Sequence, residues 1–170
     1  MKKIVKKNIG IVGATGYVGE ELLSFLDMHE GVQVSYVSSF NSEGKLLFDV
    51  VKKYSNISNL KLENINNINN FDLDIVFFAT KHDFSMSYVP NLLKRNIKVI
   101  DLSADFRFSN ESIWKNAYGT EHKSPDLLKS SIYGLPEMNS SDISKANLIG
   151  VPGCYPTASL LGLMPIAEYI

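Results

Sequence analysis

The sequence predicts an α/β fold in which helices cover both faces of a mostly parallel sheet. Two observations support this prediction. Short apolar runs rich in β-branched residues alternate with segments of helical periodicity, as in strand–helix–strand units with right-handed crossovers. The first run leads directly into three glycines, Gly13, Gly16 and Gly19, and a helical segment follows them. This order is typical of a Rossmann-like, doubly wound sheet that binds a dinucleotide.

Composition places the chain among globular proteins and excludes several kinds of partner. Of the 170 residues, 45% are hydrophobic and 21% are charged, with a formal net charge of -1. This balance offers no basic surface for nucleic acid or an anionic membrane, and no apolar run is long enough to span a bilayer. The histidines and the single cysteine lack metal-ligand spacing, so we expect no metal. One cysteine excludes an internal disulfide and is consistent with a cytoplasmic protein, which is the location we expect.

The glycine-rich turn follows the first predicted strand, residues 8–12, which is a short apolar run. Gly13 allows a tight turn, Gly16 lets the backbone approach a pyrophosphate, and Gly19 lets the following helix pack on the strand. The helix N-terminus then offers its N–H groups to phosphate. The residues expected to contact the cofactor are Gly13, Ala14, Thr15, Gly16, Tyr17, Val18 and Gly19. A plain turn is the alternative, because glycines occur in turns of every kind.

The end of the second predicted strand, residues 32–37, bears on the choice between NAD and NADP. A site that prefers NAD usually has an Asp or Glu there, which binds the ribose 2′-hydroxyl. This sequence instead has Ser38 and Ser39, with Lys45 a few residues further on. Small hydroxyls and a nearby lysine suit a 2′-phosphate, so NADP(H) is the expected cofactor, with Ser38 and Ser39 among its contacts. An ordinary solvent-exposed loop is the alternative interpretation.

Further segments extend the predicted sheet. Residues 60–62 indicate a short edge strand within an asparagine-rich loop. Residues 74–80 are a nearly continuous apolar run, typical of a buried parallel strand, and residues 98–102 form the next strand. Between these two strands the periodicity predicts a helix over residues 83–96, which Pro90 interrupts.

Three loops lie where the carboxyl ends of parallel strands open on a ligand crevice: residues 80–82, 103–107 and 133–137. Arg107, in the second of these loops, has a guanidinium that can bind a substrate carboxylate or phosphate in a bidentate manner. An ion pair of Arg107 with Asp105 or Glu111 is the alternative.

Cys154 is the single cysteine, and it stands between a predicted strand over residues 147–151 and a predicted helix over residues 157–164. A Pro-Gly pair ends the strand, and Pro156 suits the first turn of the helix. The N–H groups and dipole of a helix N-terminus favour a thiolate, which is the nucleophilic form. We therefore expect Cys154 to be a catalytic nucleophile. The alternative is a small buried hydrophobic residue.

Four motifs together resemble N-acetyl-gamma-glutamyl-phosphate reductase of arginine biosynthesis. They are residues 13–22, residues 101–107, residues 133–137 and, most specific, residues 151–158, which read Val-Pro-Gly-Cys-Tyr-Pro-Thr-Ala. The motifs follow the order and approximate spacing of that family over essentially the whole chain. The resemblance places the nucleophile of the family at Cys154.

The resemblance implies an NADPH-dependent reduction of N-acetyl-glutamyl 5-phosphate to N-acetyl-glutamate 5-semialdehyde and phosphate, through a thioester on the cysteine. The substrate is then a small-molecule acyl phosphate, and the full-length enzyme is expected to be a homo-oligomer. In the family, a second half of the polypeptide supplies most of the substrate domain and the acid–base histidine, which neither His82 nor His122 matches. We therefore expect residues 1–150 to form the NADP-binding domain, residues 151–170 to begin an α+β substrate domain whose remainder is absent, and the chain alone to be inactive.

Two alternative functions stay open. Aspartate-semialdehyde dehydrogenase uses the same fold and chemistry, although its nucleophile stands in a different, asparagine-rich context. The second alternative is a non-catalytic NADP-binding module, which the missing acid–base histidine favours.

Overall fold

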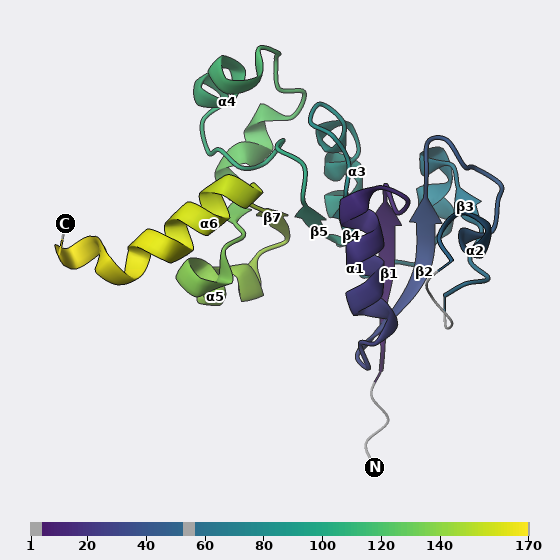
Figure 1. Ribbon diagram of the computed structural model, residues 1–170. Helices are drawn as coiled ribbons and strands as arrows, with labels where there is room; N and C mark the ends of the chain where they lie inside the picture. The colour runs from purple at the N-terminus through teal and green to yellow at the C-terminus, as the bar shows by residue number, and fades with distance from the viewer. Residues whose placement is uncertain (1–4, 53–56, 170) are drawn as a thin grey trace.

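The computed structural model describes residues 5–52 and 57–169, and in these residues seven strands form one sheet (Figure 1). The strands are β1 (Lys7–Val12), β2 (Val32–Ser38), β3 (Leu62–Glu63), β4 (Ile75–Phe78), β5 (Lys98–Asp101), β6 (Ile132–Tyr133) and β7 (Leu148–Gly150). Their order across the sheet is β3-β2-β1-β4-β5-β7-β6, and each of these strand pairs is parallel. The α/β fold is therefore confirmed, with a sheet that is wholly parallel.

Helices connect the strands. The α-helices are α1 (Tyr17–Asp27), α2 (Leu47–Val50), α3 (Val89–Lys94), α4 (Glu111–Tyr118), α5 (Pro136–Lys145) and α6 (Cys154–Leu163). Short 3-10 helices are η1 (Ile65–Asn70), η2 (Ser85–Ser87), η3 (Pro125–Ser130) and η4 (Met164–Tyr169).

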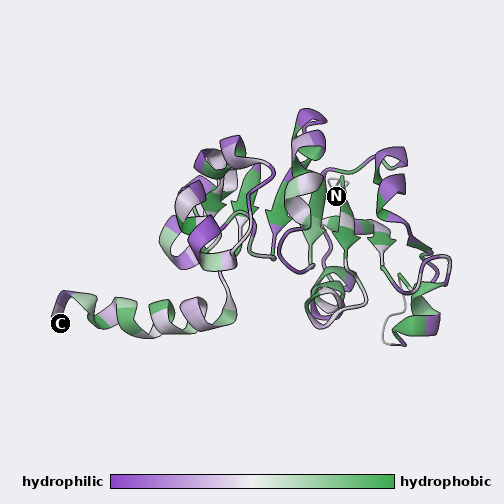
Figure 2. Ribbon diagram, turned by 90° about the horizontal axis from the view of Figure 1, so that it is seen from above, coloured by the Kyte–Doolittle hydropathy of each residue, from purple (hydrophilic) through white to green (hydrophobic). Residues whose placement is uncertain are grey.

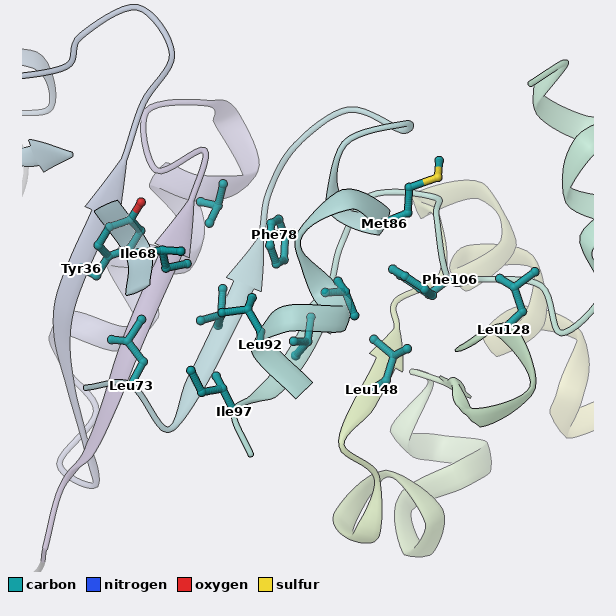
Figure 3. Packing of buried hydrophobic residues seen from close by; sticks show 14 of the residues in the cluster. Tyr36, Ile68, Leu73, Phe78, Met86, Leu92, Ile97, Phe106, Leu128 and Leu148 are labelled. Atoms are coloured by element: carbon teal, nitrogen blue, oxygen red, sulfur yellow. The ribbon is translucent and has the colours of Figure 1, made fainter. Parts of the chain in front are cut away.

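Two apolar clusters lie on opposite faces of the sheet, because successive strand side chains alternate between faces. On one face, Ile9 and Ile11 of β1 pack with Leu23 of α1 and Leu47 of α2. On the other face, Phe78 of β4 packs in a cluster with Leu92 of α3 and Leu128 of η3 (Figure 3). Trp114 of α4 belongs to the same cluster. Burial on both faces explains why the central strands read as continuous apolar runs in the sequence.

The helix predicted over residues 83–96 is shorter in the structure. The 3-10 helix η2 comes first, and α3 begins only at Val89. Pro90 therefore lies in the first turn of α3, where its missing N–H is no loss because the first N–H groups of a helix have no acceptor within it. The prediction that Pro90 interrupts this helix is wrong, since the proline helps to start it.

The predicted edge strand is present but displaced by about two residues. It was expected over residues 60–62, and the structure places β3 at Leu62–Glu63, paired with the end of β2. Lys61 instead forms an isolated antiparallel bridge with Leu46. The apolar pattern alone could not fix the register, because Leu60 packs against the same core cluster as Leu62 although it lies outside the strand.

The order of strands creates a crevice at the carboxyl edge of the sheet. The chain moves from β1 to β2 on one side and later returns to place β4 on the other side of β1. The loops after β1 and β4 therefore diverge around this switch point, which is where open α/β sheets bind ligands. The glycine-rich turn directly follows β1 and so lies at this point.

The last helices, α6 and η4, extend away from the sheet, as Figure 2 shows most clearly. None of the described side chains of α6 is buried. Several apolar side chains of this arm, among them Leu161, Leu163 and Ile166, are exposed. The assignment of residues 151–170 to a separate substrate domain stays a prediction.

Candidate functional site

The glycine-rich turn is held rigidly by its own backbone. Gly13 has φ +86°, a left-handed conformation that a side chain would strain, and a Cβ here would collide with the carbonyl oxygen of Ala79. A Cβ on Gly19 would collide with the carbonyl oxygen of Gly13, so Gly19 lets α1 pack against the turn. The backbone N–H groups of Gly13 and Ala14 donate to the carbonyl oxygen of Ser38, at 3.1 and 3.0 Å. The turn is thus shaped before any ligand arrives.

Gly16 has a different role from Gly13 and Gly19. It is the N-cap of α1, and no described side chain of the protein caps the helix there. A Cβ on Gly16 would have only the carbonyl oxygen of Gly13 within reach, at an ordinary 3.6 Å. The space beside Gly16 is therefore open to a ligand, and the N–H groups of the first turn of α1 face that space with the positive end of the helix dipole.

A cleft of about 490 Å³ lies over this turn. Its lining residues are Gly13, Thr15, Gly16, Ser39, Phe40, Asn41, Ala79, Thr80, Lys81 and Phe84. They come from the turn after β1, the loop after β2 and the loop after β4, as the switch point requires. Phe40 and Phe84 meet edge to face across the cleft, with ring centroids 4.9 Å apart. Lys81 is the charged side chain among these lining residues.

The two serines expected to contact the cofactor are both next to the turn. Ser38 is buried, and its carbonyl oxygen supports Gly13 and Ala14. The hydroxyl of Ser39 lies 2.7 Å from that of Thr15, so Ser39 ties the loop after β2 to the turn. A smaller cavity of about 70 Å³ adjoins the cleft at Ser39 and Phe40, and both Ser38 and Glu43 line it. Lys45 is exposed and lines neither cavity.

Tyr17 and Val18 point away from the cleft. The side chain of Tyr17 is 97% exposed and that of Val18 is half exposed. Both line a separate apolar cavity of about 380 Å³, together with Phe25 and Leu102. Only their backbone N–H groups, at the start of α1, face the expected position of a phosphate. The cavity joins the N-terminus of α1 to the end of β5.

Cys154 is the first residue of α6, with Gly153 as the N-cap, and its side chain is exposed. Pro156 lies in the first turn, and Thr157 bonds back to the carbonyl oxygen of Gly153 through both its N–H (3.0 Å) and its hydroxyl (2.9 Å). The predicted position of the cysteine at a helix N-terminus is therefore confirmed. The helix begins three residues earlier than the predicted start at Thr157, so the thiol is within its first turn.

Arg107 lies beside this turn and makes no ion pair with a described residue, so the alternative of a pair with Asp105 or Glu111 is wrong. Its Nε donates to the carbonyl oxygen of Val151 at 2.7 Å, and its Nη2 donates to that of Leu102 at 3.2 Å. Its Nη1 would be 3.3 Å from a Cβ placed on Gly153. The guanidinium thus bridges the ends of β5 and β7, immediately before the cysteine.

A buried polar cluster lies behind Arg107, and the sequence analysis did not identify it. Asp101 and Asp105 are fully buried, with Ser103 and Ser85 between them. The hydroxyl of Ser103 donates to the carboxylate of Asp101 at 2.7 Å, and that of Ser85 donates to Asp105 at 2.9 Å. Burial, together with the charge of Asp105, raises the pKa of Asp101 to about 6, although hydrogen bonds from Ser103 and Ser85 oppose the rise. The available signal was an aspartate at the end of an apolar strand, Asp101, with a second aspartate four residues later.

His122 is the buried histidine of this region, and its ring is held on both sides. Its Nε2 lies 2.9 Å from the carbonyl oxygen of Asp105, and the N–H of Ser124 donates to its Nδ1 at 3.0 Å. Since Nδ1 accepts a hydrogen bond, the proton of the neutral ring is on Nε2, which donates to Asp105. Phe106 and Trp114 pack edge-on against the ring. His122 therefore supports the 103–107 loop.

In the described part of the chain, no cluster of His, Cys, Asp or Glu has the arrangement of a metal site. Within the same residues, no helix has the length and apolar character needed to cross a membrane.

Comparisons with known proteins identify the family to which this fold and glycine-rich turn belong. Residues 8–146 match the family described as "Semialdehyde dehydrogenase, NAD binding domain". The chain is 42% identical over 161 residues to an N-acetyl-gamma-glutamyl-phosphate reductase of Acinetobacter baylyi, and 44% identical over 162 residues to the one of Nitrosococcus oceani. These alignments cover 95% and 94% of this chain but 46% and 47% of the relatives. The chain therefore spans about half the length of the curated relatives it matches.

Solved structures show the same fold. An aspartate semialdehyde dehydrogenase II of Vibrio cholerae, described as a complex with ASA, superposes with a TM-score of 0.69 at 26% identity. That match covers 96% of this chain and 47% of the other. An aspartate semialdehyde dehydrogenase of Candida albicans with NADP has a TM-score of 0.67 at 16% identity, over 97% of this chain and 48% of the other, and shows the fold alone.

Proposed function

Because this chain belongs to the semialdehyde dehydrogenase family, of which it has the NAD-binding domain, we propose that it supplies the cofactor-binding and nucleophile-bearing part of an N-acetyl-gamma-glutamyl-phosphate reductase. The observation that supports this most is the placement of Cys154. It is the first residue of α6, it is exposed, and the guanidinium of Arg107 lies beside the preceding glycine. Cys154 and Arg107 lie at the same edge of the sheet as the glycine-rich turn.

The residues of the cleft fit a nicotinamide dinucleotide. Gly16 leaves open the space that a side chain would fill, and the N-terminus of α1 faces it uncapped by any described side chain. We propose that the pyrophosphate lies there and that the adenosine lies near Ser39 and Phe40 in the cleft. When bound, the cofactor supplies the hydride of the reaction.

NADP(H) is the form of the cofactor that we propose. The strand β2 ends at Ser38 without a carboxylate, and Lys81 offers a positive charge to the cleft. Glu43, in the adjoining cavity, is a charge that a 2′-phosphate must avoid. The preference therefore has to come from Lys81 and from the hydroxyls of Thr15 and Ser39.

The chemistry assigned to Cys154 is acyl transfer. Its sulfur attacks the carbonyl carbon of the acyl phosphate, so a C–S bond forms while the bond to the phosphate oxygen breaks and phosphate leaves with the electron pair. Cys154 then holds the acyl group as a thioester until a hydride reaches the carbonyl carbon. When the resulting thiohemiacetal collapses, the sulfur takes back the electrons of the C–S bond and the semialdehyde is released.

Arg107 is proposed to bind the anionic part of the substrate. Two of its nitrogens are fixed by the carbonyl oxygens of Val151 and Leu102, which leaves Nη1 directed at the turn before Cys154. A guanidinium in this position can stabilise either the leaving phosphate or a substrate carboxylate.

The cytoplasm is the location that we propose, since the exposed thiol of Cys154 must stay reduced to act.

A chimeric enzyme tests the function. This chain would replace the matching half of the Acinetobacter baylyi relative, and phosphate-dependent reduction of NADP by N-acetyl-glutamate 5-semialdehyde would be measured. We expect activity with this substrate, and none after Cys154→Ser, which keeps a hydroxyl in place of the thiol. Faster turnover of aspartate semialdehyde would favour the alternative that the similarity to the Vibrio cholerae structure suggests. A chimera that binds NADPH but turns over neither substrate would favour a non-catalytic binding module.

A further inference from the structure

The side chain of Asp105 joins two parts of the proposed site that are separate in sequence. Its Oδ1 accepts the N–H of Asp83 at 2.8 Å, and its Oδ2 accepts the hydroxyl of Ser85 at 2.9 Å and the N–H of Met86 at 3.1 Å. These donors belong to the segment that follows β4. The same segment contributes Lys81 and Phe84 to the wall of the cleft.

The segment after β4 needs such an anchor. Asp83 has φ +66°, a left-handed conformation that is uncommon for residues other than glycine. The bond from its N–H to Asp105 and a second bond, from the hydroxyl of Thr120 to Oδ1 of Asp83 at 2.8 Å, hold it there. If the carboxylate of Asp105 were lost, this turn would be free to relax, and the cleft wall between Lys81 and Phe84 would move with it.

The backbone of Asp105 fixes the other part of the site. Its carbonyl oxygen accepts a hydrogen bond from His122, and its N–H donates to the hydroxyl of Ser103 at 3.2 Å. The next carbonyl oxygen, of Phe106, accepts the hydroxyl of Ser131 at 2.8 Å. These hydrogen bonds hold the loop on its way to Arg107, whose guanidinium bridges the ends of β5 and β7.

We infer that Asp105 is a positioning residue, which sets the cleft wall at Lys81–Phe84 and Arg107 beside Cys154 in one fixed relation. This inference rests on the proposed function. A carboxylate is required because three donors converge on its two oxygens. An asparagine offers one acceptor oxygen, so either the part-buried N–H of Asp83 or the buried N–H of Met86 would lose its partner.

The substitution Asp105→Asn, made in this chain rather than in the chimera, tests the inference. Two properties of the variant are measured at a temperature where it is folded. The first is NADPH affinity from nucleotide fluorescence, which we expect to weaken roughly tenfold because one of these N–H donors is left unpaired. The second is the protection of Cys154 from iodoacetamide by inorganic phosphate, which should be lost as Arg107 moves. Leu128→Ala, a cavity in the core near the same loop, serves as the stability-matched control and should change neither readout.

A second, milder pair of variants covers the case in which Asp105→Asn does not fold. Ser85→Ala and Ser131→Ala each remove one hydroxyl that donates to the 103–107 loop, but only Ser85 lies on the segment of the cleft wall. We expect NADPH binding to weaken about threefold with the first and to stay unchanged with the second. Equal affinities for both, or unchanged affinity in folded Asp105→Asn, would overturn the inference alone. Failure of the unaltered chain to bind NADPH would overturn the proposed function as well.

Discussion

Asp101 is a buried carboxylate whose pKa is shifted by its surroundings. It ends β5 fully buried, and its carboxylate accepts bonds from the hydroxyl of Ser103 at 2.7 and 2.9 Å. Burial raises its pKa from 3.8 to about 6, and the neighbouring charge of Asp105 adds to the rise. Because the pKa in the folded protein is above the unfolded value, the stabilising contribution of Asp101 is complete below about pH 4. It is lost as the pH rises through about 6.

Asp101→Asn should remove this dependence, since an amide keeps the acceptor for Ser103 but does not ionise. The free energy of unfolding of the unaltered chain, relative to that of the variant, should fall by up to about 3 kcal/mol between pH 4 and pH 7. Urea unfolding at four pH values in this range measures it. Parallel pH profiles for the two proteins would show that the carboxylate does not titrate in this window.

Arg107 allows a test of charge next to the thiol. Iodoacetate is anionic and iodoacetamide is neutral, so the ratio of their rates with Cys154 reports the local potential and cancels differences in thiol reactivity. Arg107→Met should lower this ratio roughly fivefold, because one positive charge beside Gly153 is removed. Lys115→Met, which removes an exposed charge paired with Glu121, should leave the ratio unchanged. An unchanged ratio in both variants would place Arg107 too far away to contact the substrate.

At the level of elements, different glycines of the glycine-rich turn serve the stability of the fold and the binding of the cofactor. Gly13 and Gly19 are required by the backbone around them, whereas the space beside Gly16 is open. The spacing predicted the tight turn at Gly13 and the close packing at Gly19, and the structure has both. The approach of a pyrophosphate to Gly16 stays a prediction. It could not show that the carbonyl oxygen of Ser38 holds the turn, because that bond joins two strands brought together only by the sheet.

Gly16→Val and Gly13→Val should therefore behave differently. The valine at position 16 fills the cleft and should abolish detectable NADPH binding, with a change in the free energy of unfolding below about 1 kcal/mol. The valine at position 13 meets the carbonyl oxygen of Ala79 in a left-handed conformation and should cost more than about 2 kcal/mol. Nucleotide fluorescence and urea unfolding measure the two effects. Retained binding in Gly16→Val would exclude this cleft as the dinucleotide site.

The element that sequence reasoning misjudged most is the helix expected over residues 83–96. Its apolar residues do have helical spacing, but Asp83 adopts a left-handed turn and the segment continues as η2 before α3 begins. The cause is the carboxylate of Asp105, which bonds three donors from residues 83–86. Those partners are about twenty positions away, so no local pattern could predict the distortion.

At the scale of the whole molecule, strand order explains what the sequence could and could not predict. The other strands were identifiable from their apolar runs, but β6 was not predicted, since residues 133–137 were expected to form a loop. The insertion of β7 between β5 and β6 was not predictable from the sequence either. That insertion brings Val151 next to the end of β5, where Arg107 bridges the two strands. The sequence could therefore nominate Arg107 and Cys154 separately, and only the fold shows that Arg107 lies beside Gly153, the residue before Cys154.

The arm formed by α6 and η4 makes a further prediction for the molecule as a whole. Leu163 is 53% exposed and Ile166 is 47% exposed, so replacing both with lysine should change the free energy of unfolding by less than about 0.5 kcal/mol. The same substitutions should reduce self-association in sedimentation velocity, because exposed apolar clusters make proteins associate. Leu148→Ala, buried in β7, is the contrasting control and should cost about 2–5 kcal/mol. A large loss of stability in the lysine variant would mean that the arm packs on the sheet.

The parallel order of the sheet has a consequence for the growing chain on the ribosome. β1 is made first, yet one of its two neighbours in the sheet, β4, begins only at Ile75. At synthesis rates of ~5–20 residues per second, one edge of β1 waits on the order of several seconds for its partner. During that time the backbone N–H and C=O groups on one edge of β1 are unpaired, and they can pair with the wrong strand. The half-made polypeptide, rather than the finished protein, is therefore the state most prone to misassembly, and slow translation before residue 75 would prolong it.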